Sequence, residues 1–142
     1  MVLTQRLSQR MTLSEKLEQK LAQAKITHEA ICPQCNYKMN DDEVKKGWLD
    51  DPLDITTQCP SCQHRFNAYI IVEHLDTGLD AKYYYLCLLQ LFHELNELMK
   101  KTKRTVLGKV FLDKRAPHLL FNIIRHFGNY ERGLRALKRR QK

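Results

Sequence analysis

Two short cysteine motifs constrain this chain more than any other feature of its sequence. Cys32-Pro33-Gln34-Cys35 and Cys59-Pro60-Ser61-Cys62 each place two thiols on one tight turn. When two such turns face each other, their sulfurs stand at the corners of a tetrahedron, which is the geometry of closed structural Zn²⁺ sites. The matched spacing therefore predicts one bound zinc ion with four ligands, Cys32, Cys35, Cys59 and Cys62.

Other uses of the four cysteines stay open at this stage. Two disulfides would need an oxidising compartment, and a rubredoxin-like iron site also uses four thiolates. A site with four cysteine ligands has no open coordination position, so we expect the metal to be structural. Such zinc sites contribute ~10–16 kcal/mol to the folding of small peptides, whereas a whole domain is stable by only ~5–15 kcal/mol. We therefore expect the segment around the cysteines to be unfolded without its metal.

Residues 28–74 resemble the zinc-ribbon family through these two motifs. The family's turns usually read Cys-Pro-x-Cys-Gly, and the glycine adopts a positive φ. Here Asn36 and Gln63 take that position, and asparagine accepts the left-handed conformation more readily than glutamine. The resemblance implies a small antiparallel sheet. The residue pattern predicts strands over 28–35 and 55–58, a helix over 41–47 and an alternating strand from Phe66 to about Leu75.

The N-terminal part of the chain carries an amphipathic helix pattern over residues 12–25. Thr12 followed by Glu15 forms a capping box, and Leu13, Leu17 and Leu21 make one apolar stripe. We favour a helix that packs on its own domain, and a docking or dimerisation helix is the alternative.

The second half of the chain changes from strand periodicity to helix periodicity after Asp76-Thr77-Gly78. We expect Asp80 to cap a long helix that reaches about Lys101, followed by a shorter helix over 105–113. Pro117 suits the first turn of a helix over 117–127, Gly128 would end it, and Asn129 would cap a last helix over 130–140.

Charge is distributed unevenly along the 142 residues. Residues 1–31 carry a net charge of +2, residues 32–99 carry −6, and residues 100–142 carry +12. A segment this basic favours a polyanionic partner, with nucleic acid as the first choice and an anionic membrane surface as the alternative. The acidic middle segment favours a protein partner instead.

The segment Phe127-Gly128-Asn129-Tyr130 and the residues up to Leu137 resemble a second family. They are similar to the closing segment of the helical repeats associated with homing endonucleases, which run Phe-Gly-Ser-Trp and, several residues later, Ala-Leu. The resemblance extends over residues 83–139 and implies a helix-turn-helix-like module that binds DNA. It places residues 115–126 where that family has its recognition helix.

The residue pattern supplies candidate contacts to nucleic acid. His118, Asn122 and Arg125 form one polar stripe on the helix over 117–127, and asparagine and arginine are the side chains that read adenine and guanine edges. On the last helix, arginines fall on one side and are suited to phosphates. The expected nucleic-acid contacts are Arg115, His118, Asn122, Arg125, Arg132, Arg135, Lys138 and Arg139.

Catalytic motifs are missing from the sequence. His93-Glu94 lacks the second histidine of a metalloprotease helix, because Glu97 stands there. We find no glycine-rich phosphate loop and no HNH-type or GIY-YIG-type motif. The apolar run over 83–92 is too short to span a membrane, and Cys87 within it is expected to be a buried small side chain. With no signal-peptide pattern, we expect a cytoplasmic protein that is not an enzyme.

These observations predict an α+β protein: a small antiparallel zinc-ribbon sheet, a C-terminal helix-turn-helix-like helical bundle and an N-terminal amphipathic helix. The expected divisions are an arm and helix over 1–27, the ribbon over 28–76 and a basic nucleic-acid-binding module over 79–142. The expected function is that of a DNA-binding regulator of transcription or an accessory factor, with double-stranded DNA as partner. Alternatives are an adaptor that docks RNA polymerase or the ribosome through the acidic ribbon and, ranked lower, a nuclease or nuclease subunit. A protein partner that binds through the ribbon or the N-terminal helix is also open.

Overall fold

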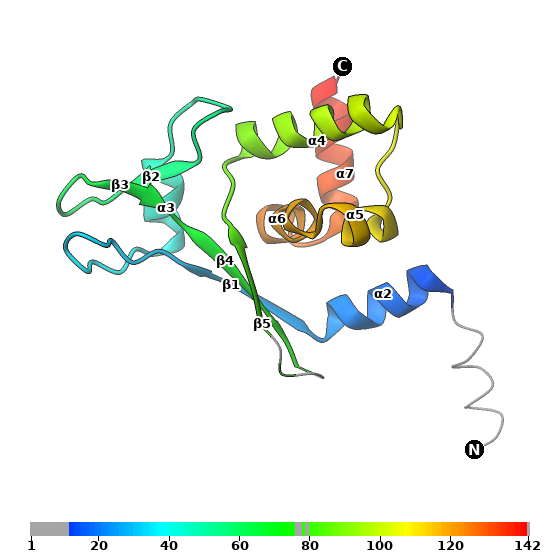
Figure 1. Cartoon of the computed structure of the whole chain (residues 1–142), viewed down its shortest axis with the longest axis horizontal. Coiled ribbons are helices and arrows are strands. Elements are labelled where there is room, and N and C mark those ends of the chain that lie inside the picture. Colours follow the sequence, from blue (N-terminus) through cyan, green and yellow to red (C-terminus); the bar gives the residue numbers. More distant parts are fainter. Residues whose placement is uncertain (1–11, 76–77, 79, 142) are drawn as a thin grey trace.

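The computed structural model describes residues 12–75, 78 and 80–141. Within these residues the chain is α+β, with small antiparallel sheets, a helical C-terminal region and an N-terminal helix (Figure 1). The predicted fold class is confirmed at this level. The predicted N-terminal arm, residues 1–11, lies outside the described residues.

Helix α2 (Leu13–Ala22) begins as the sequence predicts, because the Thr12 hydroxyl accepts a hydrogen bond from the amide of Glu15 at 3.1 Å. It ends before the predicted residue 25, since strand β1 (Ala24–Glu29) has already begun there. Leu17 is buried, but Leu13 is 60% exposed. The helix packs on its own chain, beside helix α5 (Lys109–Arg115).

The central sheet contains β1, β4 (Tyr69–His74) and β5 (Asp80–Tyr84), paired antiparallel in the order β1-β4-β5. Its inner face carries Ile70 and Val72, both fully buried. Helix α6 (Pro117–Phe127) covers this face, and the ring of Phe121 stacks on Tyr83 with centroids 5.8 Å apart. The sheet and the C-terminal helices therefore share one core.

Residues 80–84 correct the prediction of a long helix capped by Asp80. They form β5, which pairs with β4 from Asp80 opposite Glu73 to Tyr84 opposite Tyr69. Aromatic side chains suit a pleated, half-buried surface, and pairing with β4 satisfies the backbone. Helix α4 (Leu88–Thr102) begins only after the buried Cys87. The expected division at residues 76–79 thus falls within one sheet.

The cysteine-bearing half contains a second, two-stranded sheet of β2 (Thr56–Gln58) and β3 (Arg65–Asn67). Helix α3 (Asp41–Gly47) packs on β2 and matches the predicted helix. Thr57 in β2 is fully buried, and its hydroxyl donates to the carbonyl of Val44 at 2.8 Å. An added Cβ at Gly47 would lie 2.6 Å from the amide nitrogen of Gln58, so this contact requires glycine.

The C-terminal helices α4, α5, α6 and α7 (Tyr130–Gln141) enclose an apolar core (Figure 1). Pro117 occupies the first turn of α6, Gly128 ends it with φ of 87°, and the side chain of Asn129 accepts from the amide of Arg132. These local predictions are confirmed, but α5 begins after Gly108, later than predicted. None of the described helices is long and apolar enough to cross a membrane.

Candidate metal centre and nucleic-acid interface

Each cysteine pair lies on a turn that is closed by the same two backbone hydrogen bonds. The amides of Cys32 and Cys59 donate to the carbonyl five residues later, and their carbonyls accept from the amide four residues later, at 2.8–3.0 Å. Asn36 and Gln63 have φ of 63° and 66°, the left-handed conformation that glycine adopts most readily. Both turns therefore reach this conformation without a glycine.

The two turns bring the four sulfurs together at the end of the molecule opposite the C-terminal helices (Figure 1). All four Sγ atoms lie within 4.8 Å of one another. Cys32 Sγ is 3.4 Å from Cys62 Sγ, and Cys35 Sγ is 3.5 Å from Cys59 Sγ. A zinc–sulfur tetrahedron with bonds of about 2.3 Å has edges of about 3.8 Å. A disulfide needs about 2.05 Å, so these are free thiols arranged for one metal ion.

The electrostatics of the four sulfurs also favour a bound cation at this position. Burial raises the pKa of Cys59, but hydrogen bonds from the amides of Cys62 and Ser61 and the neighbouring sulfurs lower it to about 7. The amide of His64 lowers the pKa of Cys62, whereas burial and the other sulfurs raise it to about 12. Four adjacent thiolates repel one another, and a divalent cation removes that repulsion.

The inner half of the site is part of the protein core. Cys32 and Cys59 are fully buried and belong to the apolar cluster that includes Met39, Val44 and Phe66. Cys35 is exposed and Cys62 is partly buried, so the outer half of the site borders solvent. Four thiolates would complete a tetrahedral ligand set around one metal ion.

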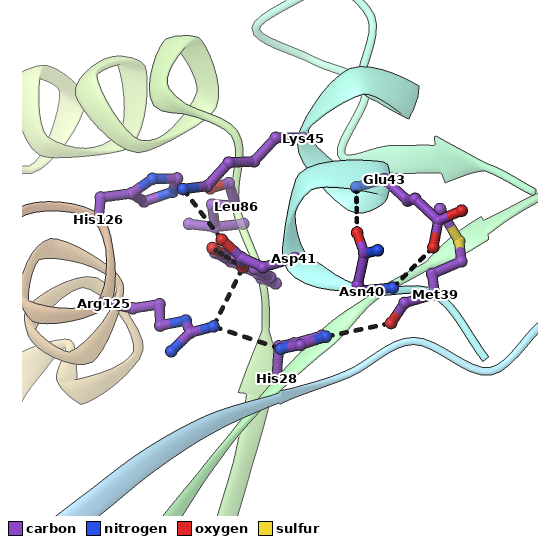
Figure 2. Close-up of polar contacts among 10 residues, drawn as sticks. His28, Met39, Asn40, Asp41, Glu43, Lys45, Leu86, Arg125 and His126 are labelled. Atoms are coloured by element: carbon purple, nitrogen blue, oxygen red, sulfur yellow. Dashed lines mark hydrogen bonds and ion pairs between the residues drawn. The ribbon is translucent and has the colours of Figure 1, made fainter.

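A polar network joins the cysteine-bearing half to helix α6, and Figure 2 shows its side chains meeting between α3, β1 and α6. Asp41 at the start of α3 accepts hydrogen bonds from Arg125 Nη2 at 3.1 Å and from Tyr85 at 2.8 Å. Its second oxygen is 3.0 Å from Lys45 Nζ. Burial opposes ionisation of Asp41, but these donors outweigh it and lower its pKa to about 2.

Two histidines complete this network. His28 Nδ1 is 3.3 Å from Arg125 Nη2, and its Nε2 is 3.1 Å from the carbonyl of Met39 (Figure 2). A proton on Nε2 satisfies both contacts, because Nδ1 then accepts from the guanidinium. His126 Nε2 donates to the carbonyl of Leu86 at 2.6 Å, and burial lowers its pKa. The two histidines therefore add contacts to a network in which Asp41 forms ion pairs with both Arg125 and Lys45.

Asn122 corrects the expectation that this residue reads a base edge. It is fully buried. Its side-chain oxygen accepts from the amide of Leu86 at 2.8 Å, and its nitrogen donates to the carbonyls of Tyr84 and His118. These bonds give hydrogen-bond partners to backbone groups at the junction of β5 and α4, which are not paired within a strand or a helix.

Arg125 and His118, the other members of the predicted polar stripe, also have partners within the protein. Arg125 is partly buried and is held by Asp41. His118 is partly exposed, with Nε2 3.9 Å from a carboxylate oxygen of Glu94. Asn122 and Arg125 therefore face the β5–α4 connection and the cysteine-bearing half, whereas His118 lies beside α4, and the three do not form one free base-reading surface.

Helix α7 presents the predicted arginines to solvent. Arg132, Arg135 and Arg139 line a surface groove of about 810 Å³ whose floor contains apolar side chains of α4, α6 and α7. Among the described residues, no carboxylate oxygen lies within ion-pair distance of these three guanidinium groups. Arg115 at the end of α5 and Lys138 on α7 are also exposed. The apolar floor consists of Leu88, Phe92, Phe127 and Ala136.

Comparison of the chain with family models, curated proteins and solved structures found no match. The geometry of the chain's own residues therefore carries the functional argument.

Sequence reasoning did not find the polar network. Asp41 entered the prediction only as the first residue of the helix over 41–47, and Tyr85 only as part of the apolar run over 83–92. Arg125 was the available signal, because it is the only Lys, Arg, Asp or Glu on the largely apolar α6, and a partly buried arginine needs an acidic partner.

Proposed function

We propose that this chain is a zinc-ribbon protein that binds nucleic acid, with double-stranded DNA as the first choice, through its basic C-terminal helices. In this proposal the zinc is structural and the protein acts as a DNA-binding regulator or accessory factor. The observation that carries it is the groove between α4 and α7 with its three exposed arginines.

The arrangement of these arginines suits a phosphate backbone. Arg132, Arg135 and Arg139 follow one side of α7 over about 10 Å, since a helix rises ~1.5 Å per residue. That length spans successive phosphates of one strand, and arginine forks bind phosphate oxygens in pairs. Among the described residues no carboxylate oxygen forms a close ion pair with the three guanidinium groups, although Glu131 acts on Arg135 at longer range.

The proposal assigns the cysteine-bearing half a supporting role. Its metal orders the turns and α3, and Asp41 then fixes α6 through Arg125. Helix α7 packs on α6 at Gly133, where an added Cβ would lie 3.2 Å from a ring carbon of Phe127. The arginine groove is thereby connected to the metal centre through a continuous set of packed elements.

A salt titration with matched variants tests this proposal. One variant replaces Arg132, Arg135 and Arg139 with alanine. The control replaces three exposed lysines outside the groove, Lys100, Lys101 and Lys114. Each lost phosphate contact flattens the slope of log K against log salt by ~0.9 on duplex DNA, so the arginine variant should lose up to about 2.7 from that slope. The lysine variant should keep most of it.

Equal slopes in the two variants would show that only the net charge matters and that the groove is not the binding site. Full duplex affinity in the arginine variant would overturn the proposal.

A second candidate function, docking of a protein partner, is favoured by the loop between α3 and β2. Leu53 is 77% exposed and Leu49 is 45% exposed. The loop is held in shape by its aspartates, because Asp51 accepts from the amide of Leu53 and Asp54 from the amide of Thr56. Ordered and exposed leucines among acidic residues are typical of a contact surface for a partner with basic and apolar groups.

A capture experiment separates this candidate from the first. The full chain would be compared with a variant that carries Leu49→Ser and Leu53→Ser, using purified RNA polymerase and ribosomes as baits. Loss of capture in the variant with unchanged DNA binding would support docking. Equal capture by the two proteins would remove this loop from consideration.

A further inference from the structure

A pair of stacked tyrosines lies on the face of the central sheet that α6 does not cover. Tyr69 and Tyr84 are directly opposite each other on β4 and β5, and their rings stack with centroids 5.3 Å apart and 24° between planes. Tyr84 is 48% exposed. A ring that is stacked on one side and half exposed offers its other side to a ligand.

A lysine extends over this pair. Lys82 Nζ lies 4.3 Å from the centre of the Tyr69 ring and 3.3 Å from a carboxylate oxygen of Glu29. It is half exposed despite these contacts. The lysine therefore places a positive charge at the border of an aromatic surface, a combination that binding sites for unpaired nucleic acid use for phosphate and base together.

A pocket of about 540 Å³ adjoins the tyrosines and is lined by residues of β5, α4 and α6. Its far wall carries Gln90, Glu94 and His118. Gln90 Oε1 is buried and has no hydrogen-bond partner among the described residues, which is a costly state for an acceptor. Amide and carboxylate groups of this kind bind the exposed edges of unpaired bases.

We propose that this pocket binds an unpaired base of a single-stranded nucleic acid. The base stacks on Tyr84, its polar edge meets Gln90 and Glu94, and the adjoining phosphate meets Lys82. This proposal deepens the proposed function and rests on it, because it assigns a second contact to the same polyanionic partner.

The pocket and the arginine groove lie on opposite sides of the first turns of α4. Gln90 and Glu94 face the pocket, whereas Leu88 and Phe92 line the groove, and residues two positions apart on a helix point in nearly opposite directions. In this proposal, a ligand that occupies both sites has a duplex part in the groove and an unpaired part in the pocket. We expect junctions of this kind to bind more tightly than a duplex alone.

The first test uses Tyr84→Ala, with Tyr84→Phe as the matched control that keeps the ring. The probes are a deoxythymidine strand and a duplex, each about 20 nucleotides long. Loss of stacking should weaken strand binding by Tyr84→Ala about 5- to 150-fold, while Tyr84→Phe stays within about twofold of the wild type. Duplex binding should not change in either variant. Unchanged strand binding by Tyr84→Ala would overturn the inference.

The second test uses the wild-type chain and a deoxythymidine dinucleotide, whose single internucleotide phosphate cannot engage the three arginines of the groove together. NMR signals of the Tyr84 ring and the Gln90 amide should shift in a saturable way. If these signals do not shift, the pocket is not a base site. This holds even when the groove variant, in which Arg132, Arg135 and Arg139 are replaced with alanine, has lost duplex binding. If they move while the groove variant keeps its duplex affinity, the proposed function fails and the pocket remains.

Discussion

Asp41 and Arg125 lie 84 residues apart in the sequence, and they form an ion pair with 3.1 Å between Oδ1 and Nη2. Asp41 opens the helix that packs beside the metal centre, and Arg125 is on the helix that covers the central sheet (Figure 2). The pair is partly buried and also contacts Tyr85, Lys45 and His28. It therefore fixes how the cysteine-bearing half sits on the C-terminal helices.

Replacing Asp41 with asparagine should destabilise the protein at neutral pH. The folded-state pKa of Asp41, about 2, lies below its usual value, so its ionisation stabilises the fold fully above about pH 5. This stability is lost as the pH falls from about 4 to 2. Allowing for partial exposure, we expect a loss of about 1–2 kcal/mol at pH 7 and a smaller difference near pH 2, measured by urea unfolding.

Asp42→Asn is the control for this prediction, because Asp42 is the exposed neighbour on the same helix turn. Acid also releases a thiolate-bound metal in all three proteins, so the difference between the two variants isolates Asp41. A pH-independent difference would show that the charge of Asp41 does not carry the effect.

Asn122→Ala should reduce stability rather than relax recognition of a base. The substitution leaves the Leu86 amide and the Tyr84 carbonyl without their partner in a buried position. Each unpaired group costs ~1–3 kcal/mol, so we expect a total loss of about 3 kcal/mol in thermal or urea unfolding. Asn129→Ala, which removes an exposed helix cap, should cost only ~1 kcal/mol. Equal losses in these two variants would contradict the assigned role of Asn122.

Purified protein should contain one zinc ion per chain, and Cys59→Ser should lose it. A tetrahedral zinc site needs all four thiolates as ligands, so the removal of one leaves only three ligands for the metal. Cys87→Ala is the control, because this cysteine is buried outside the cluster. Metal analysis checks the prediction. Stoichiometric iron in the wild type, or full zinc content in Cys59→Ser, would show that the assignment is wrong.

Chelation should unfold the two cysteine turns and β2–β3 but leave the central sheet largely intact. Strands β2 and β3 pair over only three residues each, whereas β4 is hydrogen-bonded to a strand on either side and carries the fully buried Ile70 and Val72. Hydrogen exchange before and after addition of a chelator measures this. Loss of protection throughout β4 would show that the metal supports the whole sheet, as the sequence alone suggested.

Local signals in the sequence predicted much of the metal centre and of the helix ends. The cysteine spacing predicted the sulfur cluster, because two short turns supply all four sulfurs and the remaining chain only has to bring the turns together. The same holds for Thr12, Pro117 and Asn129, whose roles depend on backbone groups within a few residues. Such signals need no knowledge of distant neighbours.

Tertiary structure alone decided where Asp80–Tyr84 and the polar side of α6 belong. The apolar run after residue 80 suits a strand or a helix equally well, and the free edge of β4 selected the strand. A polar stripe on a helix faces solvent only if no buried backbone group elsewhere in the fold needs a hydrogen-bond partner. Here the connection after β5 left two backbone groups for Asn122, and the start of α3 supplied a carboxylate for Arg125. Such pairings join groups that are distant in the sequence, and helical periodicity carries no information about them.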